Sequence, residues 1–128
     1  MFDTDIISFL IRGSSLSLKN RFESENSDNF SLSVLVYAEI LFGLKKSGNE
    51  QITNKVKTFI DNLRIVDFSV EAAEVYSKIR IHLEKSGRPT GNMDLLIAAS
   101  AITEGAVLVT HNTRHFQNIP DLKIEDWL

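Results

Sequence analysis

Four acidic residues interrupt stretches of the sequence that are otherwise apolar. Asp94 is the only charged residue of GNMDLLIAASAIT, Glu39 is the only one of VLVYAEILFGL, and Asp3 and Asp5 stand at the start of a third apolar segment. An unpaired carboxylate in such surroundings costs several kcal/mol unless it finds a partner or a cation. Each acid alone has a structural explanation, since Asp94 suits the first turn of a helix and Glu39 could be a satisfied or snorkelling glutamate. Their recurrence in three segments predicts a shared site of oxygen ligands.

Oxygen ligands without a Cys or His partner favour Mg²⁺ or Mn²⁺ over zinc. The sequence has no cysteine, and His111 and His115 have no third His close by, so a zinc site is not expected. Without a cation, such a pocket would repel a phosphodiester. With one or two cations it can bind phosphate oxygens and lower the pKa of a bound water. The acids therefore predict metal-dependent attack on a nucleic-acid backbone.

The composition is that of an ordinary globular protein, with 43% hydrophobic and 24% charged residues among 128. This length suits one domain over residues 1–128. The formal net charge of −3 is unusual for a nucleic-acid binder, so either the partner is not nucleic acid, or basic groups gather locally, or the acids cluster around a cation. No apolar run approaches the roughly 18 residues of a membrane span. No secretory signal is visible, and the lack of cysteine fits a reducing compartment, so we expect a cytoplasmic protein.

Expected strands alternate with expected helices along the whole chain. The strands are expected at the N-terminus and at residues 30–34, 64–68, 106–110 and 122–124. This alternation predicts a parallel, doubly wound α/β sheet with right-handed crossovers. Ligand sites in such sheets lie beyond the carboxyl ends of the strands, where Asp3, Ser33 and Thr110 fall.

Two local expectations bear on the site. A helix from Ser33, its expected cap, to about Lys46 places Glu39 on one face with Leu35 and Phe42, so Glu39 should point with the apolar side. The segment HNTRHF at 111–116 is expected to be a polar loop.

Four motifs, taken in order, resemble the PIN-domain family. MFDTDIISFLI is similar to its opening strand, which usually ends in Asp-Thr-Asn, and SLSVLVYAEILFGL is similar to its second motif, with the Glu. GRPTGNMDLLIAASA resembles the third motif, with the Asp, and VLVTHNTRHFQNIPDLKIEDW resembles the C-terminal signature. The likeness covers nearly the whole chain and extends to the VapC toxins of bacterial VapBC toxin–antitoxin pairs, especially those ending in a Leu-x-x-Glu-Asp-Trp-like sequence.

The resemblance implies a PIN domain over residues 1–128 with the activity of a Mg²⁺- or Mn²⁺-dependent endoribonuclease. Such a toxin stops translation by cutting a structured RNA, with tRNA, and initiator tRNA in particular, as a candidate. Carried over to this chain, the metal-binding catalytic acids are Asp3, Glu39 and Asp94. Thr4 and Ser33 match hydroxyl positions of the family that orient the acids, and helix capping is compatible with that role.

Two positions depart from the family pattern. Asp5 stands where the family usually has Asn, and it either adds a ligand, adds excess charge or caps the helix. Asn112 stands at or near the place of a fourth acid, so we expect it in the site without a charge. Thr110, at a strand end, is a further supporting candidate. Arg88 and Arg114 lie in loops near motif ends and are the better candidates for contacts with RNA phosphates.

The resemblance also implies partners. Such toxins form homodimers and heteromeric complexes with a small VapB-like antitoxin, whose C-terminal segment lies across the acidic crevice. The pair commonly binds operator DNA through the antitoxin alone, and no membrane is involved.

Two other interpretations stay open at this point. Asp3-Thr4-Asp5 fits the Asp-x-Asp pattern of haloacid dehalogenase-type phosphatases, but no counterpart of their later motifs is evident and Glu39 would go unexplained. The departures at Asp5 and Asn112 also suit a PIN-like module that binds RNA or an antitoxin without cutting. A dinucleotide-binding fold is not supported, because the sequence lacks Gly-x-Gly-x-x-Gly.

Overall fold

The computed structural model describes residues 1–128. The helices are α1 (Thr4–Arg12), α2 (Leu16–Ser24), α3 (Val34–Ser47), α4 (Glu50–Ile60), α5 (Val70–Lys85), α6 (Asn92–Thr103) and α7 (Thr113–Phe116), with a 3₁₀ turn at Ser27–Asn29. The strands are β1 (Ser31–Ser33), β2 (Arg64–Val66), β3 (Leu108–Val109) and β4 (Ile124–Glu125). None of the helices combines the length and the apolar character that crossing a membrane requires.

The strands form two parallel pairs that the N-terminal backbone joins. β1 pairs with β2, β3 pairs with β4, and Phe2 forms a parallel bridge with Val109. The Phe2 N–H donates to the Ser31 carbonyl at 2.9 Å, and the Asp3 N–H donates to the Val109 carbonyl at 2.9 Å. The resulting parallel order is β2, β1, the N-terminal segment, β3 and β4. This confirms the predicted parallel α/β architecture and puts Asp3 at its centre.

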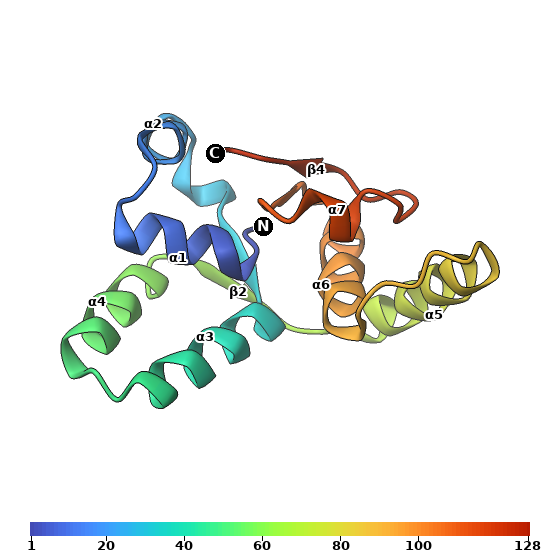
Figure 1. The fold of residues 1–128 in the computed structure, drawn as a ribbon, viewed down its shortest axis with the longest axis horizontal. Helices are drawn as coiled ribbons and strands as arrows, with labels where there is room; N and C mark the ends of the chain where they lie inside the picture. Colours follow the sequence, from blue (N-terminus) through green and yellow to red (C-terminus); the bar gives the residue numbers. More distant parts are fainter.

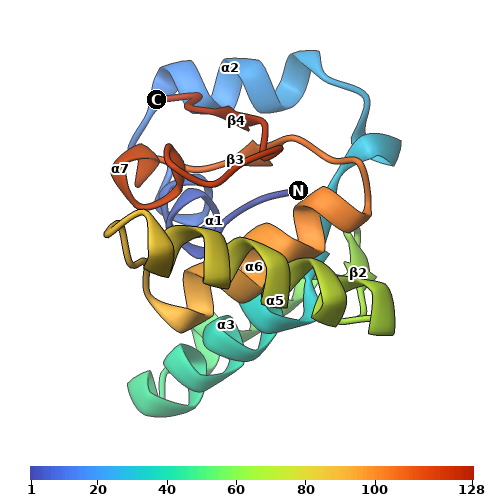
Figure 2. The same ribbon diagram turned by 90° about the vertical axis from the view of Figure 1, so that its right-hand side faces the viewer.

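The helices lie in two groups around these strands (Figure 1). α1, α3 and α4 lie on one side of the N-terminus, and the closely packed pair α5 and α6 lies on the other. Seen from the side of that pair, α2, β4 and β3 lie at the same end of the molecule, with α2 outermost (Figure 2). A site at the centre can therefore take residues from both helix groups.

Side-chain caps fix where the helices begin, as the sequence predicts. The Ser33 hydroxyl accepts a hydrogen bond from the Val36 N–H at 3.1 Å, and the Ser69 hydroxyl accepts one from the Ala72 N–H at 3.1 Å. Gly13 ends α1 with a φ of 62°, a left-handed conformation that favours glycine.

The core combines aliphatic side chains with an aromatic cluster beneath α2. Phe2 contacts Phe30 and Trp127 in edge-to-face geometry, with ring centroids 5.0 and 5.4 Å apart. Phe22 stacks on Phe30 at 4.7 Å. Trp127 is buried, so the end of the chain packs back onto the body of the protein. This cluster anchors the N-terminal segment that carries Asp3.

Three local expectations were wrong. Val34 begins α3 instead of ending a strand, because the Ser33 cap closes the strand one residue earlier. The predicted polar loop at 111–116 contains α7, since burying Phe116 folds a helical turn there. Phe42 is 69% exposed, because α3 turns Val36 and Ile40 toward the core instead.

Candidate active site

Asp3 is the most buried of the four acids, with 5% of its surface exposed. It ends the N-terminal extended segment and caps α1. Its Oδ1 accepts a hydrogen bond from the Thr4 N–H at 2.8 Å, and its Oδ2 accepts one from the Thr110 hydroxyl at 2.9 Å. Burial raises the pKa of Asp3, and the charges of Asp5 and Asp94 raise it further, while the two hydrogen bonds oppose the shift. The structure thus holds a carboxylate in a place that disfavours its charge.

Glu39 reaches the same site from the other helix group. It lies within α3, which begins at β1 and is fixed by the Ser33 cap. Its side chain is half-buried rather than turned into the core with Val36 and Ile40. Burial raises the pKa of Glu39, and the charges of Asp3 and Asp94 add to the increase. Glu39, Asp3 and Asp94 therefore share one negative electrostatic field.

Asp94 comes from the first turn of α6, with 28% of its side chain exposed. Its Oδ2 lies 3.0 Å from Nδ1 of His115, which is the one hydrogen bond that its carboxylate makes. This contact was not predicted from the sequence. His115 lies in α7, in the segment that was expected to be a loop, so the direction of its ring was not readable from the spacing.

The residues after β3 support three of the four acids. The Thr110 hydroxyl donates to Asp3, the His111 N–H donates to Asp5 Oδ2 at 3.1 Å, and the His115 ring contacts Asp94. Only Glu39 has no partner from this segment. The segment from Thr110 through α7 thus connects the start of α1 to the start of α6.

Asp5 uses both carboxylate oxygens on backbone groups. Oδ1 accepts from the Ile6 N–H at 2.7 Å, and Oδ2 accepts from the His111 N–H. Burial raises the pKa of Asp5, while these hydrogen bonds and the nearby His111 side chain lower it. This arrangement connects α1 to the β3–α7 loop, which suits a supporting role better than that of a ligand.

The predicted hydroxyl and amide residues differ in whether their side chains already make hydrogen bonds. The Thr4 hydroxyl is buried and makes no hydrogen bond of good geometry, although it faces Glu39 closely enough to lower the pKa of that acid. The Ser33 hydroxyl is used as the α3 cap. Asn112 is exposed, and its side chain does not cap α7, so its amide is free. The Thr110 hydroxyl also accepts the Asn112 N–H at 3.1 Å.

The two predicted RNA-contacting arginines lie in separate segments. Nη1 of Arg88 donates to Oδ1 of Asn118 at 3.4 Å, which links the loop before α6 to the segment after α7. Arg114 is exposed in α7 next to His115.

The donor set suits a hard cation, although the side chains have not converged on one point. No three acidic or histidine side chains lie close enough together to form a metal-binding group in this structure. The fit rests instead on three carboxylates that repel one another and on the unpaired buried hydroxyl of Thr4. Mg²⁺ and Mn²⁺ take such oxygen ligands, often with water completing the shell.

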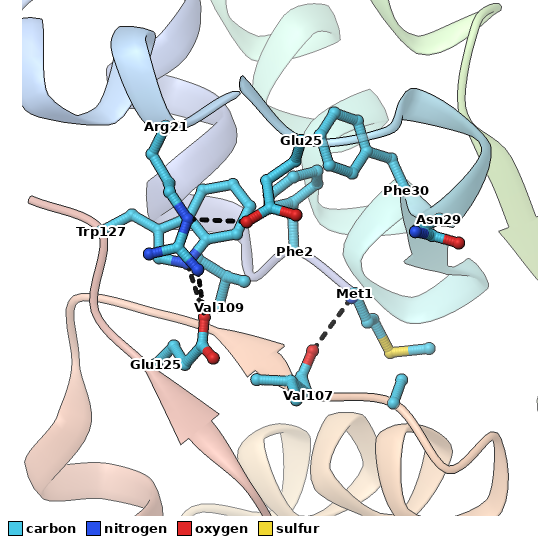
Figure 3. A pocket seen from close by; sticks show the side chains of 11 residues that line it. Met1, Phe2, Arg21, Glu25, Asn29, Phe30, Val107, Val109, Glu125 and Trp127 are labelled. Atoms are coloured by element: carbon cyan, nitrogen blue, oxygen red, sulfur yellow. Dashed lines mark hydrogen bonds and ion pairs between the residues drawn. The ribbon is translucent and has the colours of Figure 1, made fainter. Parts of the chain in front are cut away.

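Two cavities lie near the centre of the fold. A groove of about 450 Å³ lies between α1, α3 and α4 and has Thr4, Glu39 and Arg12 in its lining. The other cavity, of about 310 Å³, lies beside Met1 and Trp127 (Figure 3). Its charged groups are paired, since Arg21 contacts Glu25 at 2.8 Å and Glu125 at 3.3 Å. Of the four acids, only Glu39 lines the first cavity, and none of them lines the second.

Comparisons with known proteins agree with this fold. The family profile of the PIN domain matches residues 1–122. The chain is 40% identical to Ribonuclease VapC2 of Rickettsia felis, over 99% of this chain and 96% of that protein. It is 33% identical to the tRNA(fMet)-specific endonuclease VapC of Shigella flexneri, again over 99% and 96%.

Solved structures show the same similarity. VapBC2 from Rickettsia felis, bound to a promoter DNA fragment, contains a chain with a TM-score of 0.91 and 38% identity, covering 100% of this chain and 98% of that one. DNA-bound VapBC from Salmonella typhimurium gives a TM-score of 0.92 at 34% identity, covering 100% and 97%. The chain belongs to the PIN-domain family, and within it to the VapC ribonucleases of VapBC toxin–antitoxin systems.

Proposed function

We propose that this chain is a Mg²⁺- or Mn²⁺-dependent endoribonuclease toxin that cuts a structured RNA and so inhibits translation. The observation that carries the proposal is the shared field of Asp3, Glu39 and Asp94, in which the charges of the two aspartates raise the pKa of Glu39. Such a cluster is unfavourable without a cation and attracts one when the acids are ionised. The tRNA(fMet)-specific relatives in Shigella flexneri and Salmonella typhimurium make initiator tRNA the first substrate to test.

Each residue of the site has a role in this proposal. Asp3, Glu39 and Asp94 would hold the cation, which supplies charge neutralisation at the phosphate and a more acidic water. Thr110 and the Thr4 N–H fix both oxygens of Asp3 before substrate arrives. The Thr4 hydroxyl is available to donate to Glu39.

Groups outside this set would contact the RNA. The amide of Asn112 is free to hold a water or a phosphate oxygen, although it adds no charge. Arg114 is exposed beside the site, and Arg88 lies in the loop that leads into α6. Both would bind phosphates of the RNA backbone, which is where most of the salt-dependent affinity for nucleic acid originates.

The proposed partners are a VapB-like antitoxin and a second copy of this chain. The similar structures from Rickettsia felis and Salmonella typhimurium are VapBC complexes with DNA. Glu39 and Thr4 line the groove between α1, α3 and α4, so a peptide lying in it would cover Glu39. Operator DNA would be bound through the antitoxin, in keeping with the net charge of −3 of this chain. We place the toxin in the cytoplasm, where its RNA substrate and its antitoxin are made.

A second candidate function is a PIN-like module that binds RNA or antitoxin without cutting. It is favoured by the neutral Asn112 and by the lack of a converged metal-binding group. The acids would then serve only electrostatic or structural purposes.

One experiment separates the two functions. Purified, antitoxin-free protein is incubated with total bacterial tRNA and Mg²⁺ or Mn²⁺, beside an EDTA control and Asp94→Asn. The nuclease proposal expects one discrete cut that disappears with EDTA and in the variant, and the product end identifies the RNA. Intact tRNA, together with intact ribosomal RNA in a parallel incubation, would instead support the binding module if the protein is folded and binds Mn²⁺.

A further inference from the structure

His115 holds the carboxylate of Asp94 from a rigid position. Its Nδ1 lies 3.0 Å from Oδ2 of Asp94, and α7 carries the ring to that point. α7 is anchored by Phe116, which is 1% exposed, and it packs against α6. The His115 N–H also donates to the Asn112 carbonyl at 3.0 Å. The backbone that presents the ring is therefore fixed on the same helix pair that carries Asp94.

Asp94 depends on this contact more than the other acids depend on theirs. Asp3 accepts two hydrogen bonds and Asp5 accepts two, whereas the Asp94 carboxylate accepts only the one from His115. Gly91, at the N-cap position of α6, has no side chain that could hydrogen-bond to the Asp94 carboxylate. Without the imidazole, the Asp94 side chain would be free to change rotamer.

We propose that His115 is a positioning residue for metal binding, which fixes Oδ2 of Asp94 so that the other oxygen faces the cation. The inference rests on the proposed function, because it assumes that Asp94 is a ligand. A hydrogen-bond donor behind a ligand restricts its orientation before the cation arrives, and loss of such partners typically weakens metal affinity by about 10- to 100-fold. The Nδ1 atom donates, so the ring needs its proton on that nitrogen.

The competing explanation is an ordinary surface ion pair, since 58% of the His115 side chain is exposed. Exposed pairs contribute little to stability. The chain offers a matched comparison, because His111 contacts Asp126 at 2.9 Å with 51% of its side chain exposed. Asp126 belongs to the C-terminal segment beside Trp127 and is none of the proposed ligands. The two pairs have the same chemistry, but only the His115 pair includes a proposed metal ligand.

The test is Mn²⁺ binding measured by calorimetry, without RNA, for wild type, His115→Ala, His115→Asn and His111→Ala. We expect His115→Ala to weaken Mn²⁺ binding by about tenfold, the lower end of what loss of a supporting partner costs. Asn places an amide N–H near the position of Nδ1, so His115→Asn should recover most of the affinity. His111→Ala should stay within about twofold of wild type, as expected for an exposed pair away from the ligands.

The same variants are then assayed for RNA cleavage across a Mn²⁺ series. The cleavage rate of His115→Ala should approach that of wild type at saturating Mn²⁺, since only positioning is lost. Unchanged or tighter Mn²⁺ binding by His115→Ala, or equal weakening in His111→Ala, would overturn the inference, as would a rate that stays low at saturation. Asp94→Asn separates the two proposals, because Mn²⁺ affinity equal to wild type in that variant refutes Asp94 as a ligand altogether.

Discussion

The two sides of the acidic site differ in how firmly they are built. On one side, Thr110 and His115 hold Asp3 and Asp94 with hydrogen bonds of 2.9 and 3.0 Å. On the other side, Glu39 has only the Thr4 hydroxyl nearby, and that hydroxyl is buried without a hydrogen bond of good geometry. The comparison indicates a preorganised half and a half that a cation would complete.

The largest effect should come from removing the charge of the best-held acid. Asp3→Asn keeps the shape of the side chain but removes a ligand charge worth several kcal/mol in metal-assisted reactions, so cleavage should fall by about a thousandfold. The rate is measured on end-labelled tRNA in Mn²⁺. A loss of less than about tenfold, equivalent to roughly 1.4 kcal/mol, would show that the preorganised side is not the chemical centre.

Replacing the two threonines should affect the free energy of unfolding differently if one side of the site is preorganised and the other is not. Thr110→Val removes a buried hydrogen bond to Asp3 and should lower the free energy of unfolding by about 1–2 kcal/mol in EDTA. Thr4→Val removes a hydroxyl that is unpaired, so it should not destabilise the metal-free protein. Urea unfolding of both variants gives the two values. Equal destabilisation would show that Thr4 is already engaged and that the two sides are alike.

The stability of the metal-free protein should depend on pH through Asp3. The folded state raises the pKa of this acid, chiefly by burial, so its contribution to stability is fully present below the unfolded pKa and is lost as pH rises through the folded pKa. Because Asn does not ionise, Asp3→Asn removes the loss of folding stability that the wild-type protein suffers as pH rises. In EDTA at pH 7 the variant should therefore melt at a higher temperature than wild type, and the difference should narrow as pH falls. A gap that stays constant with pH would contradict the raised pKa.

The smallest effect is expected at Asp5, which uses both oxygens on backbone N–H groups. Asp5→Asn, the residue usual in the family, keeps one acceptor and loses the other. Removing one hydrogen bond should cost about 1 kcal/mol of stability and leave the cleavage rate within a fewfold of wild type. A loss as large as that of Asp3→Asn would instead make Asp5 a ligand and extend the preorganised side.

The sequence predicted the parts of the site that depend on local pattern. Asp3 and Thr110 were selected because the alternation of strands and helices places both at strand ends, and the structure brings them into hydrogen-bond contact. Asp94 and Glu39 were selected because they are charges in apolar runs, and their catalytic role stays a prediction. Ser33 was recognised as a helix cap and does cap α3. These signals come from residues close together in the sequence, so they can be recognised without knowing how the helices and strands pack.

The missed parts depend on how the elements pack. The core-facing side of α3 is the one with Ile40, and Phe42 is exposed, because docking against α1 and α6 sets the rotation of the helix. The contact of His115 with Asp94 requires α7, which forms when Phe116 is buried against the rest of the protein. The connection from Asp5 to the His111 backbone joins residues 106 positions apart. None of these has a signature in the spacing of residues.

The most direct test of the account is the position of Mn²⁺ in a crystal of the antitoxin-free protein, located by anomalous scattering. We predict a peak bound by Asp3, Asp94 and Glu39, with the Glu39 side chain moved toward the other two, and no such peak in crystals of Asp94→Asn. A peak elsewhere on the protein, or none at these acids in a crystal soaked with Mn²⁺, would contradict the claim that the three carboxylates form one metal site.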